Sequence, residues 1–88
     1  MAYRVELAPS ARRELARLDR TMQRRIGDAL DALQDQPRPA GVTKLAGLEN
    51  TWRIRVGTCR VVYQIHADRL VVLVVRIAHR KDVYRGGS

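Results

Sequence analysis

Arginines in the second half of the chain are the residues whose type and spacing could do chemistry. Arg53 and Arg55 lie two positions apart in the segment TWRIRV, and Arg60, Arg76 and Arg80 follow. The guanidinium group is planar and always charged, and it can donate two parallel hydrogen bonds to a phosphate group. These side chains could therefore hold an RNA backbone and stabilise the charge that develops when a phosphodiester breaks. They would be poor general bases, because the guanidinium pKa is above about 12.

Proton transfer would need another side chain, and the candidates are His66, His79 and Tyr84. A lone histidine in a strand is more often structural than catalytic, and His79 falls on the opposite side of its strand from Arg80. The sequence shows no nucleophile–base pair, no glycine-rich phosphate loop and no carboxylate pair. With the single cysteine Cys59 and no Cys–His cluster, it predicts neither an internal disulfide nor a metal site, and we expect no cofactor.

Net charge is the strongest compositional signal. Seventeen Lys and Arg residues against nine Asp and Glu give +8 at pH 7 and an isoelectric point near 11.0. Residues 1–50 hold nine basic and seven acidic side chains, whereas residues 51–88 hold eight basic and two acidic ones. This asymmetry favours a polyanionic partner, with nucleic acid first and a membrane surface second. The alternative is an ordinary domain from an arginine-rich proteome, since 15 of the 17 basic residues are arginine.

Length and hydropathy predict one small cytoplasmic domain. Eighty-eight residues can form one modest core, so we expect a single domain over residues 1–88, frayed over about 85–88. The longest apolar run, residues 70–75, is too short to cross a membrane. Arg4 and Glu6 interrupt the first apolar stretch, which argues against a signal peptide and for a cytoplasmic protein without a membrane partner.

The first half of the chain predicts a strand followed by two helices. Apolar and charged residues alternate over residues 2–7, as in a strand with one buried face. Pro9 suits the first turn of a short amphipathic helix, and Asp19 can cap a second one that ends before two prolines. The apolar stripe of the second helix comprises Met22, Ile26, Ala29, Leu30 and Leu33. In the connection that follows, Leu45 and Leu48 are expected to pin the chain to the core.

A two-residue turn at residues 57–58 predicts a hairpin in which Arg55 lies directly opposite Arg60. The apolar residues of both strands then share one face, and Arg53 joins the other two arginines on the opposite face. Like charges directly opposite destabilise a sheet by up to about 1 kcal/mol. We therefore expect a negative group between them, and the alternative is a solvated face with chance arginines.

Arg76 and Arg80 share one face of the last strand, and we expect this face to be open, because burying Arg76 without a partner is costly. A strict two-residue turn at residues 67–68 would place odd-numbered residues beside Arg60, so the sequence predicts a longer turn or a bulge.

The patterns together predict an α+β fold in which a helical hairpin packs on one face of a four-stranded, mostly antiparallel sheet. Further RNA contacts are expected from Lys44, Arg76, His79, Lys81 and Arg85.

Four segments of the sequence resemble the RelE group of the RelE/ParE toxin superfamily. They are KLAGL at residues 44–48, WRIRV at 52–56, CRVVYQ at 59–64 and VRIAHRKDVY at 75–84. The resemblance covers nearly the whole chain and implies the RelE-like microbial RNase fold. It further implies the toxin of a type II toxin–antitoxin system, a metal-independent endoribonuclease that cleaves messenger RNA in the ribosomal A site and so inhibits translation.

The resemblance also implies site residues and partners. The catalytic residues of the family match Arg53, Arg55, Arg60, Arg80 and Tyr84. The expected partners are a cognate antitoxin protein, messenger RNA on the ribosome and operator DNA, the last only through the antitoxin.

This sequence departs from RelE proper at Arg53 and Arg55, where RelE has lysines. A lysine with a lowered pKa can act as a base, so transition-state stabilisation carries over more readily than proton transfer, and the identity of the general base stays open. Two other functions also stay open: a ParE-like DNA gyrase inhibitor without catalysis, and an inactive antitoxin-binding or nucleic-acid-binding module. The combination of Arg60, Arg80 and Tyr84 favours the RelE-like function.

Overall fold

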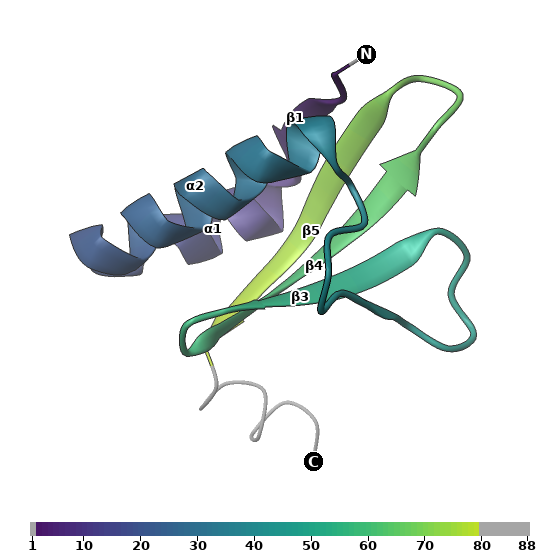
Figure 1. The fold of residues 1–88 in the computed structure, drawn as a ribbon. Coiled ribbons are helices and arrows are strands. Elements are labelled where there is room, and N and C mark those ends of the chain that lie inside the picture. The colour runs from purple at the N-terminus through teal and green to yellow at the C-terminus, as the bar shows by residue number, and fades with distance from the viewer. Residues whose placement is uncertain (1, 80–88) are drawn as a thin grey trace.

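Two helices and five strands make up the part of the chain that the structure describes, residues 2–79 of a computed structural model (Figure 1). In chain order they are β1 (Arg4–Leu7), α1 (Pro9–Ala16), α2 (Arg20–Asp35), β2 (Thr43–Lys44), β3 (Thr51–Val56), β4 (Cys59–His66) and β5 (Val71–His79). The predicted α+β order is confirmed. The addition is β2, which forms inside the predicted connection and is too short to leave an alternating pattern in the sequence.

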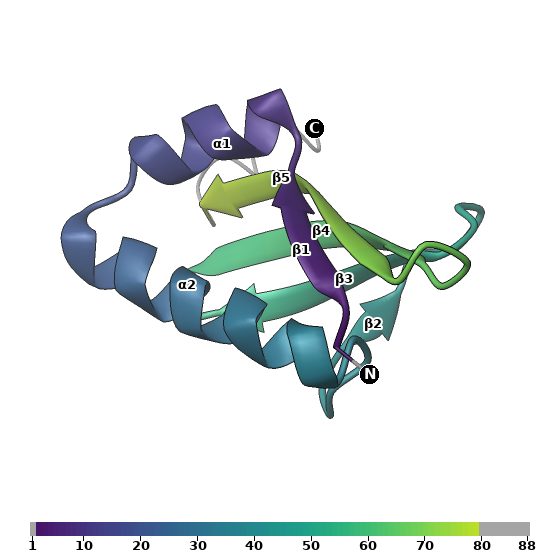
Figure 2. The ribbon, with the colours of Figure 1, turned by 90° about the horizontal axis from the view of Figure 1, so that it is seen from above.

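The strands form one sheet in the order β1-β5-β4-β3-β2. β1 pairs with β5 in parallel, and the other neighbours are antiparallel. Both helices lie on the same side of the sheet, where α1 packs chiefly against β5 and α2 against β1 and β3 (Figure 2). Neither of these helices is long and apolar enough to span a membrane.

Both helices begin where the sequence predicts. Pro9 occupies the first turn of α1, and the Asp19 carboxylate accepts a 2.8 Å hydrogen bond from the Met22 amide at the start of α2. The apolar stripes of the helices and one face of the sheet form a single core. Its fully buried residues are Ala11, Ile26, Leu33, Cys59, Val61, Tyr63, Val72 and Val74.

Tyr63 ties the sheet to the end of α2. Its side chain is fully buried on β4, and its hydroxyl donates a 2.7 Å hydrogen bond to the carbonyl oxygen of Pro37, just beyond α2. Burial raises the pKa of Tyr63 to about 12, although the neighbouring Arg38 charge acts to lower it. The hydroxyl is therefore a neutral donor at physiological pH.

The β3–β4 hairpin has the predicted register. Trp52 pairs with Tyr63, and Arg55 lies directly opposite Arg60. Gly57 in the turn has a φ of 58°, a left-handed conformation that glycine adopts without strain. Because the odd-numbered residues of β4 face the helices, Arg60 lies on the uncovered face, together with the arginines of β3.

The β4–β5 hairpin contains both irregularities that the sequence offered as alternatives, a longer turn and a bulge within the paired strands. The turn has four residues, 67–70, in place of two. Two extra residues leave the odd–even alternation unchanged, so the turn alone would still place an odd-numbered residue opposite Arg60. A β-bulge makes the difference, because the pairing of β4 with β5 shifts by one residue between Val62 and Tyr63.

This bulge turns Arg76 out of the core. On one side of the shift Val72 and Val74 face the helices, whereas on the other side Ile77 does. Arg76 then has the same odd–even position as Arg60, and its exposed side chain reaches Glu14 of α1 at the edge of β5. An unbroken ladder would direct the Arg76 guanidinium toward the helices, where an unpaired charge is costly. The predicted open position of Arg76 is therefore confirmed.

Tyr63→Phe should lower the free energy of unfolding by about 1 kcal/mol at neutral pH, because the Pro37 carbonyl loses its donor. The tyrosine holds its proton to about pH 12 in the folded chain but only to about pH 10 when unfolded. Wild-type stability should therefore fall as the pH rises from 10 to 12, and this fall should be smaller in the variant.

Urea denaturation at pH 7 and across the alkaline range measures both effects. Tyr3→Phe is the matched control, because the Tyr3 side chain is half-buried and its hydroxyl has no hydrogen bond within residues 2–79. An equal alkaline loss of stability in Tyr63→Phe and wild type would contradict the assignment.

Candidate nucleic-acid interface

Three arginines line one pocket on the uncovered face of the sheet. Arg53, Arg55 and Arg60 surround a hollow of about 280 Å³, and Gly41 and Thr43 complete its wall. Arg53 and Arg60 are half-buried, whereas Arg55 is exposed. None of the three forms an ion pair with another described residue. The pocket therefore holds three positive charges that residues 2–79 do not neutralise.

The hairpin register concentrates this charge. Arg55 lies opposite Arg60 across the two strands, and a second hollow of about 70 Å³ beside them is lined by the same two arginines and by Gly57 and Thr58. Opposed like charges cost from a few tenths to about 1 kcal/mol on a sheet. The arrangement does not help the chain to fold, and it suits an anion such as a phosphate group, which guanidinium groups bind through paired hydrogen bonds.

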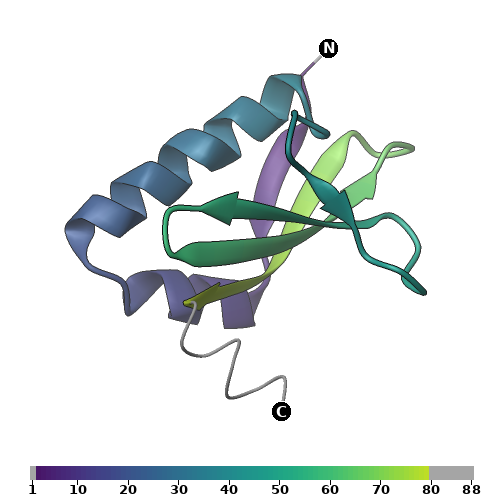
Figure 3. The ribbon, with the colours of Figure 1, turned by 60° about the horizontal axis from the view of Figure 1, so that its bottom comes forward.

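β2 supplies the part of the pocket that sequence analysis missed. Thr43 pairs with Arg53 and shares its face, and Gly41 precedes it with a φ of 87°, which favours glycine. Figure 3 shows the short teal strand β2 beside the green β3–β4 hairpin. A strand of two residues has no periodicity to detect, so only its pairing with β3 reveals this wall.

Lys44, predicted to bind RNA, lies on the other face of the sheet. It pairs with Trp52, and its ammonium nitrogen is 5.9 Å from the centre of the Trp52 ring. The guanidinium carbon of Arg38 is 5.6 Å from the same ring. Cation–π contacts at exposed sites contribute about 0.5–1 kcal/mol each. Lys44 therefore helps to hold β2 against β3 and does not enter the arginine pocket.

Arg76 faces outward, but an acidic side chain binds it. Its Nε donates a 2.9 Å hydrogen bond to one carboxylate oxygen of Glu14, and the other oxygen accepts a 2.7 Å bond from the Ile77 amide. The Ser10 hydroxyl donates to the Val75 carbonyl at 3.0 Å. Beyond the end of β1, side chains of α1 thus form hydrogen bonds with the backbone along the edge of β5. Arg76 has a structural partner, so less of its charge is available to RNA.

Neither histidine lies with the arginines of the pocket. His79 pairs with Cys59 on the helix side of the sheet and lines a separate hollow of about 400 Å³ between α1 and β5. His66 is six residues from Arg60 along β4, about 20 Å at the usual rise per residue, and its Nε2 is 3.0 Å from Gln64 Oε1. The structure brings together three of the predicted site arginines, Arg53, Arg55 and Arg60, and leaves both histidines elsewhere.

Four of the predicted site residues lie outside the described residues, and their roles stay predictions. They are Arg80, Lys81, Tyr84 and Arg85. Within residues 2–79, no three His, Cys, Asp or Glu side chains gather into a group that could hold a metal ion.

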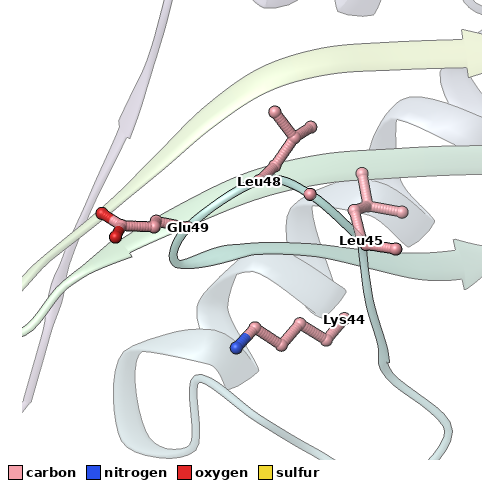
Figure 4. Close-up of a pocket in the computed structure, with 6 residues that line it drawn as sticks. Lys44, Leu45, Leu48 and Glu49 are labelled. Carbon is pink, nitrogen blue, oxygen red and sulfur yellow. The ribbon is translucent and has the colours of Figure 1, made fainter.

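A further hollow of about 540 Å³ follows β2 and is lined by residues 44–49 (Figure 4). Leu45 and Leu48 project to one side of this loop and Lys44 to the other. Leu45 is half-buried, but Leu48 is 55% exposed, so the prediction that both leucines pin the connection to the core is wrong for Leu48. One lysine and one glutamate line this hollow, so it carries less positive charge than the arginine pocket.

Known proteins resemble this chain over nearly its whole length. Residues 5–84 match the family model of the ParE toxin of type II toxin–antitoxin systems. Toxin RelG of Mycobacterium tuberculosis is 33% identical over 86 residues, which cover 97% of this chain and 99% of that toxin.

Solved toxin–antitoxin complexes share the fold. The RelE–RelB complex of the archaeon Pyrococcus horikoshii matches with a TM-score of 0.81 and 28% identity, covering 91% of this chain and 97% of that chain. The intact RelBE complex of Escherichia coli matches with a TM-score of 0.80 and 25% identity, covering 89% and 96%.

Glu14→Ala should lower the free energy of unfolding by about 2 kcal/mol, because it leaves the half-buried Ile77 amide without its acceptor. The ion pair itself should add little, since the Arg76 side chain is 57% exposed. Arg12→Ala on the solvent side of the same helix is the matched control and should change stability by less than about 0.5 kcal/mol. Urea denaturation measures the three variants Glu14→Ala, Arg76→Ala and Arg12→Ala. A Glu14→Ala effect as small as the control would show that α1 does not secure β5 in this way.

Proposed function

The chain belongs to the ParE toxin family of type II toxin–antitoxin systems, within the RelE/ParE superfamily, and we propose that it is a metal-independent endoribonuclease that cleaves messenger RNA in the ribosomal A site. Its place of action is then the cytoplasm, where it inhibits translation. The observation that carries this proposal is the pocket on the uncovered face of the sheet lined by Arg53, Arg55 and Arg60, which form no ion pair within residues 2–79. Similarity to toxins of the RelE type supports it.

The proposed reaction is an attack of a ribose 2′ oxygen on the adjacent phosphorus. The O2′–P bond forms and the P–O5′ bond breaks. The 2′ hydroxyl gives its proton to a general base, and the departing O5′ takes one from a general acid, which leaves a 2′,3′-cyclic phosphate and a 5′ hydroxyl. Negative charge grows on the non-bridging oxygens in the transition state, and fixed guanidinium groups stabilise charge at that place.

Seven of the predicted residues have a role in this proposal. Arg53, Arg55 and Arg60 bind the scissile phosphate and stabilise the transition state, and Arg80 and Tyr84 complete the catalytic set. Lys81 and Arg85 bind the RNA backbone. His79, Lys44 and Arg76 are less suited to this role, because the first two lie on the helix side of the sheet and Arg76 is paired with Glu14.

The proposed protein partner is a cognate antitoxin. The similar RelE and RelBE chains were solved as toxin–antitoxin complexes. A net charge of +8 favours a partner of opposite charge and an association that slows as salt rises. Contact with operator DNA would come only through this antitoxin.

A ParE-like gyrase inhibitor is the second candidate function, because the matching family model is that of the ParE toxin. Induction of such a protein would block replication first, whereas the proposed endoribonuclease would block translation first. Incorporation of labelled thymidine and labelled methionine after induction separates these two candidates, and an inactive binding module would affect neither.

Arg55→Ala and Arg60→Ala should each reduce cleavage by about 10²–10³-fold, as expected when one preorganised cation is removed from the transition state. Both variants should fold as well as wild type, because each relieves a repulsion. Arg69→Ala is the matched control: this arginine is exposed beside Asp68 in the β4–β5 turn and lines no part of the pocket. Primer extension on messenger RNA incubated with ribosomes measures cleavage, and thermal melting measures folding. Full activity in both pocket variants would remove them from the site.

Both histidines lie away from the arginine pocket, so we propose that the Tyr84 hydroxyl takes part in proton transfer. His66→Gln should retain wild-type cleavage, whereas Tyr84→Phe should lose cleavage as completely as Tyr84→Ala, because the hydroxyl and not the ring takes part. The same primer extension assay measures all three variants. An active Tyr84→Phe beside an inactive Tyr84→Ala would assign base stacking to the ring instead.

A further inference from the structure

Six exposed arginines gather where α1 and α2 meet, on the side of the domain away from the arginine pocket. They are Arg12, Arg13, Arg17, Arg20, Arg24 and Arg25. Arg17 lies in the link at residues 17–19, and each of the others is at most six residues, fewer than two helical turns, from it. This link projects beyond the strands of the sheet (Figure 1, Figure 2). None of the six forms an ion pair or a side-chain hydrogen bond with another described residue. We refer to them as the helical-link arginines.

The charges along α2 run against its helix dipole. Arg20 and Arg24 lie at the N-terminal end, where the dipole is positive, and Asp31 and Asp35 lie at the C-terminal end. The first turn holds no acidic residue and the last turn holds no basic one. Of these four charges, Arg20 and Asp35 lie in the terminal turns, and each is unfavourably placed by about 0.3–1 kcal/mol at an exposed site. Folding stability therefore does not explain these arginines, and a negatively charged partner would.

Arg25 connects the helical-link arginines to the pocket. Its Nη1 lies 3.0 Å from the place that a Cβ on Gly57 would occupy, so the guanidinium group lies against the turn of the β3–β4 hairpin. The same turn lines a hollow together with Arg55 and Arg60. A band of positive charge thus runs from the uncovered face of the sheet, around the turn, to the link between the helices.

We propose that the helical-link arginines dock on the sugar–phosphate backbone of a double-helical segment of ribosomal RNA and so orient the pocket toward the messenger RNA. This proposal rests on the proposed function in taking the ribosome as the source of that RNA. The surface carries six guanidinium groups and, among the described residues, no aromatic side chain on which unpaired bases could stack. Double-stranded RNA is bound mainly through its phosphates and 2′ hydroxyls, which this surface suits.

Its exposed neighbours also disfavour other partners. The remaining exposed residues between Arg12 and Arg25 are Ala16, Asp19 and Thr21. The larger apolar side chains there, Leu15, Leu18 and Met22, pack against the core, so no large exposed apolar side chain is present to insert into a membrane or to anchor a protein interface. Phosphate contact without apolar anchoring makes binding strongly dependent on salt.

The test compares two double variants with the same change in charge. Arg20→Gln with Arg24→Gln removes two helical-link arginines, and Arg4→Gln with Arg69→Gln removes two exposed arginines that each have an acidic neighbour. The probe is a blunt 16-base-pair RNA duplex, and fluorescence anisotropy gives its affinity between 50 and 200 mM salt. The helical-link variant should bind the duplex at least about tenfold more weakly than wild type, and its slope of log affinity against log salt should be smaller in magnitude by about two. The control variant should change both quantities much less.

Binding to ribosomes separates this proposal from the proposed function. The helical-link variant should lose cosedimentation with empty ribosomes, whereas Arg60→Ala should retain it and lose only cleavage. If no variant cleaves RNA but the duplex and ribosome results hold, the endoribonuclease function fails and the docking surface stands. Equal weakening in both double variants would overturn the proposal. So would an unchanged affinity for the duplex and the ribosome with a weakened affinity for the antitoxin.

Discussion

The β-bulge between Val62 and Tyr63 is the constraint on which the rest of the structure depends. Side chains alternate strictly along a strand. In an unbroken β4–β5 ladder, Arg76 would therefore face the helices together with Val72 and Val74. The shift by one residue puts Ile77 in the core instead and turns Arg76 outward, where Glu14 of α1 binds both its guanidinium and the Ile77 amide. The docking of α1 on the free edge of β5 follows from that one irregularity.

The two faces of the sheet have separate roles. The helix side supplies stability through a continuous apolar core, with the Tyr63 hydroxyl joined to Pro37 at its margin. The uncovered side holds Arg53, Arg55 and Arg60 close together at some electrostatic cost, which the core has to offset. Because the charged residues and the core residues alternate on the same strands, the strands that build the core also fix the spacing of the arginines. A site built on paired strands is held more precisely than one built on a loop.

Positive charge is therefore not spread evenly over this domain. It forms a pocket that suits one phosphate group, and it continues past Gly57 to the six arginines at the link between the helices. A toxin that acts on RNA within a ribosome meets negative charge on several sides, and a domain of 88 residues has few other ways to orient itself there.

The sequence by itself determined the elements whose signals are local. Pro9 and Asp19 mark the helix starts, and the turn at residues 57–58 fixes the register that sets Arg55 opposite Arg60, because a hairpin register depends only on its own turn. Arg60 and Arg76 both have even numbers, whereas a strict two-residue turn pairs even-numbered with odd-numbered residues. The sequence therefore showed that an irregularity was needed, although it could not distinguish a longer turn from a bulge. The resemblance to RelE-like toxins rested on segments near these arginines and held over nearly the whole chain.

Only the tertiary structure decided the contacts between segments distant in the chain. β2 is too short to have a sequence pattern of its own. Only its pairing with β3 shows that Thr43 lines the arginine pocket and that Lys44 lies against Trp52. The pairing of Glu14 with Arg76 joins residues 62 positions apart, and no spacing rule relates them. The approach of Arg25 to Gly57 depends on how α2 packs against the sheet. Local patterns record turns, caps and periodicity, whereas the neighbours of a side chain across the core depend on packing of the whole chain.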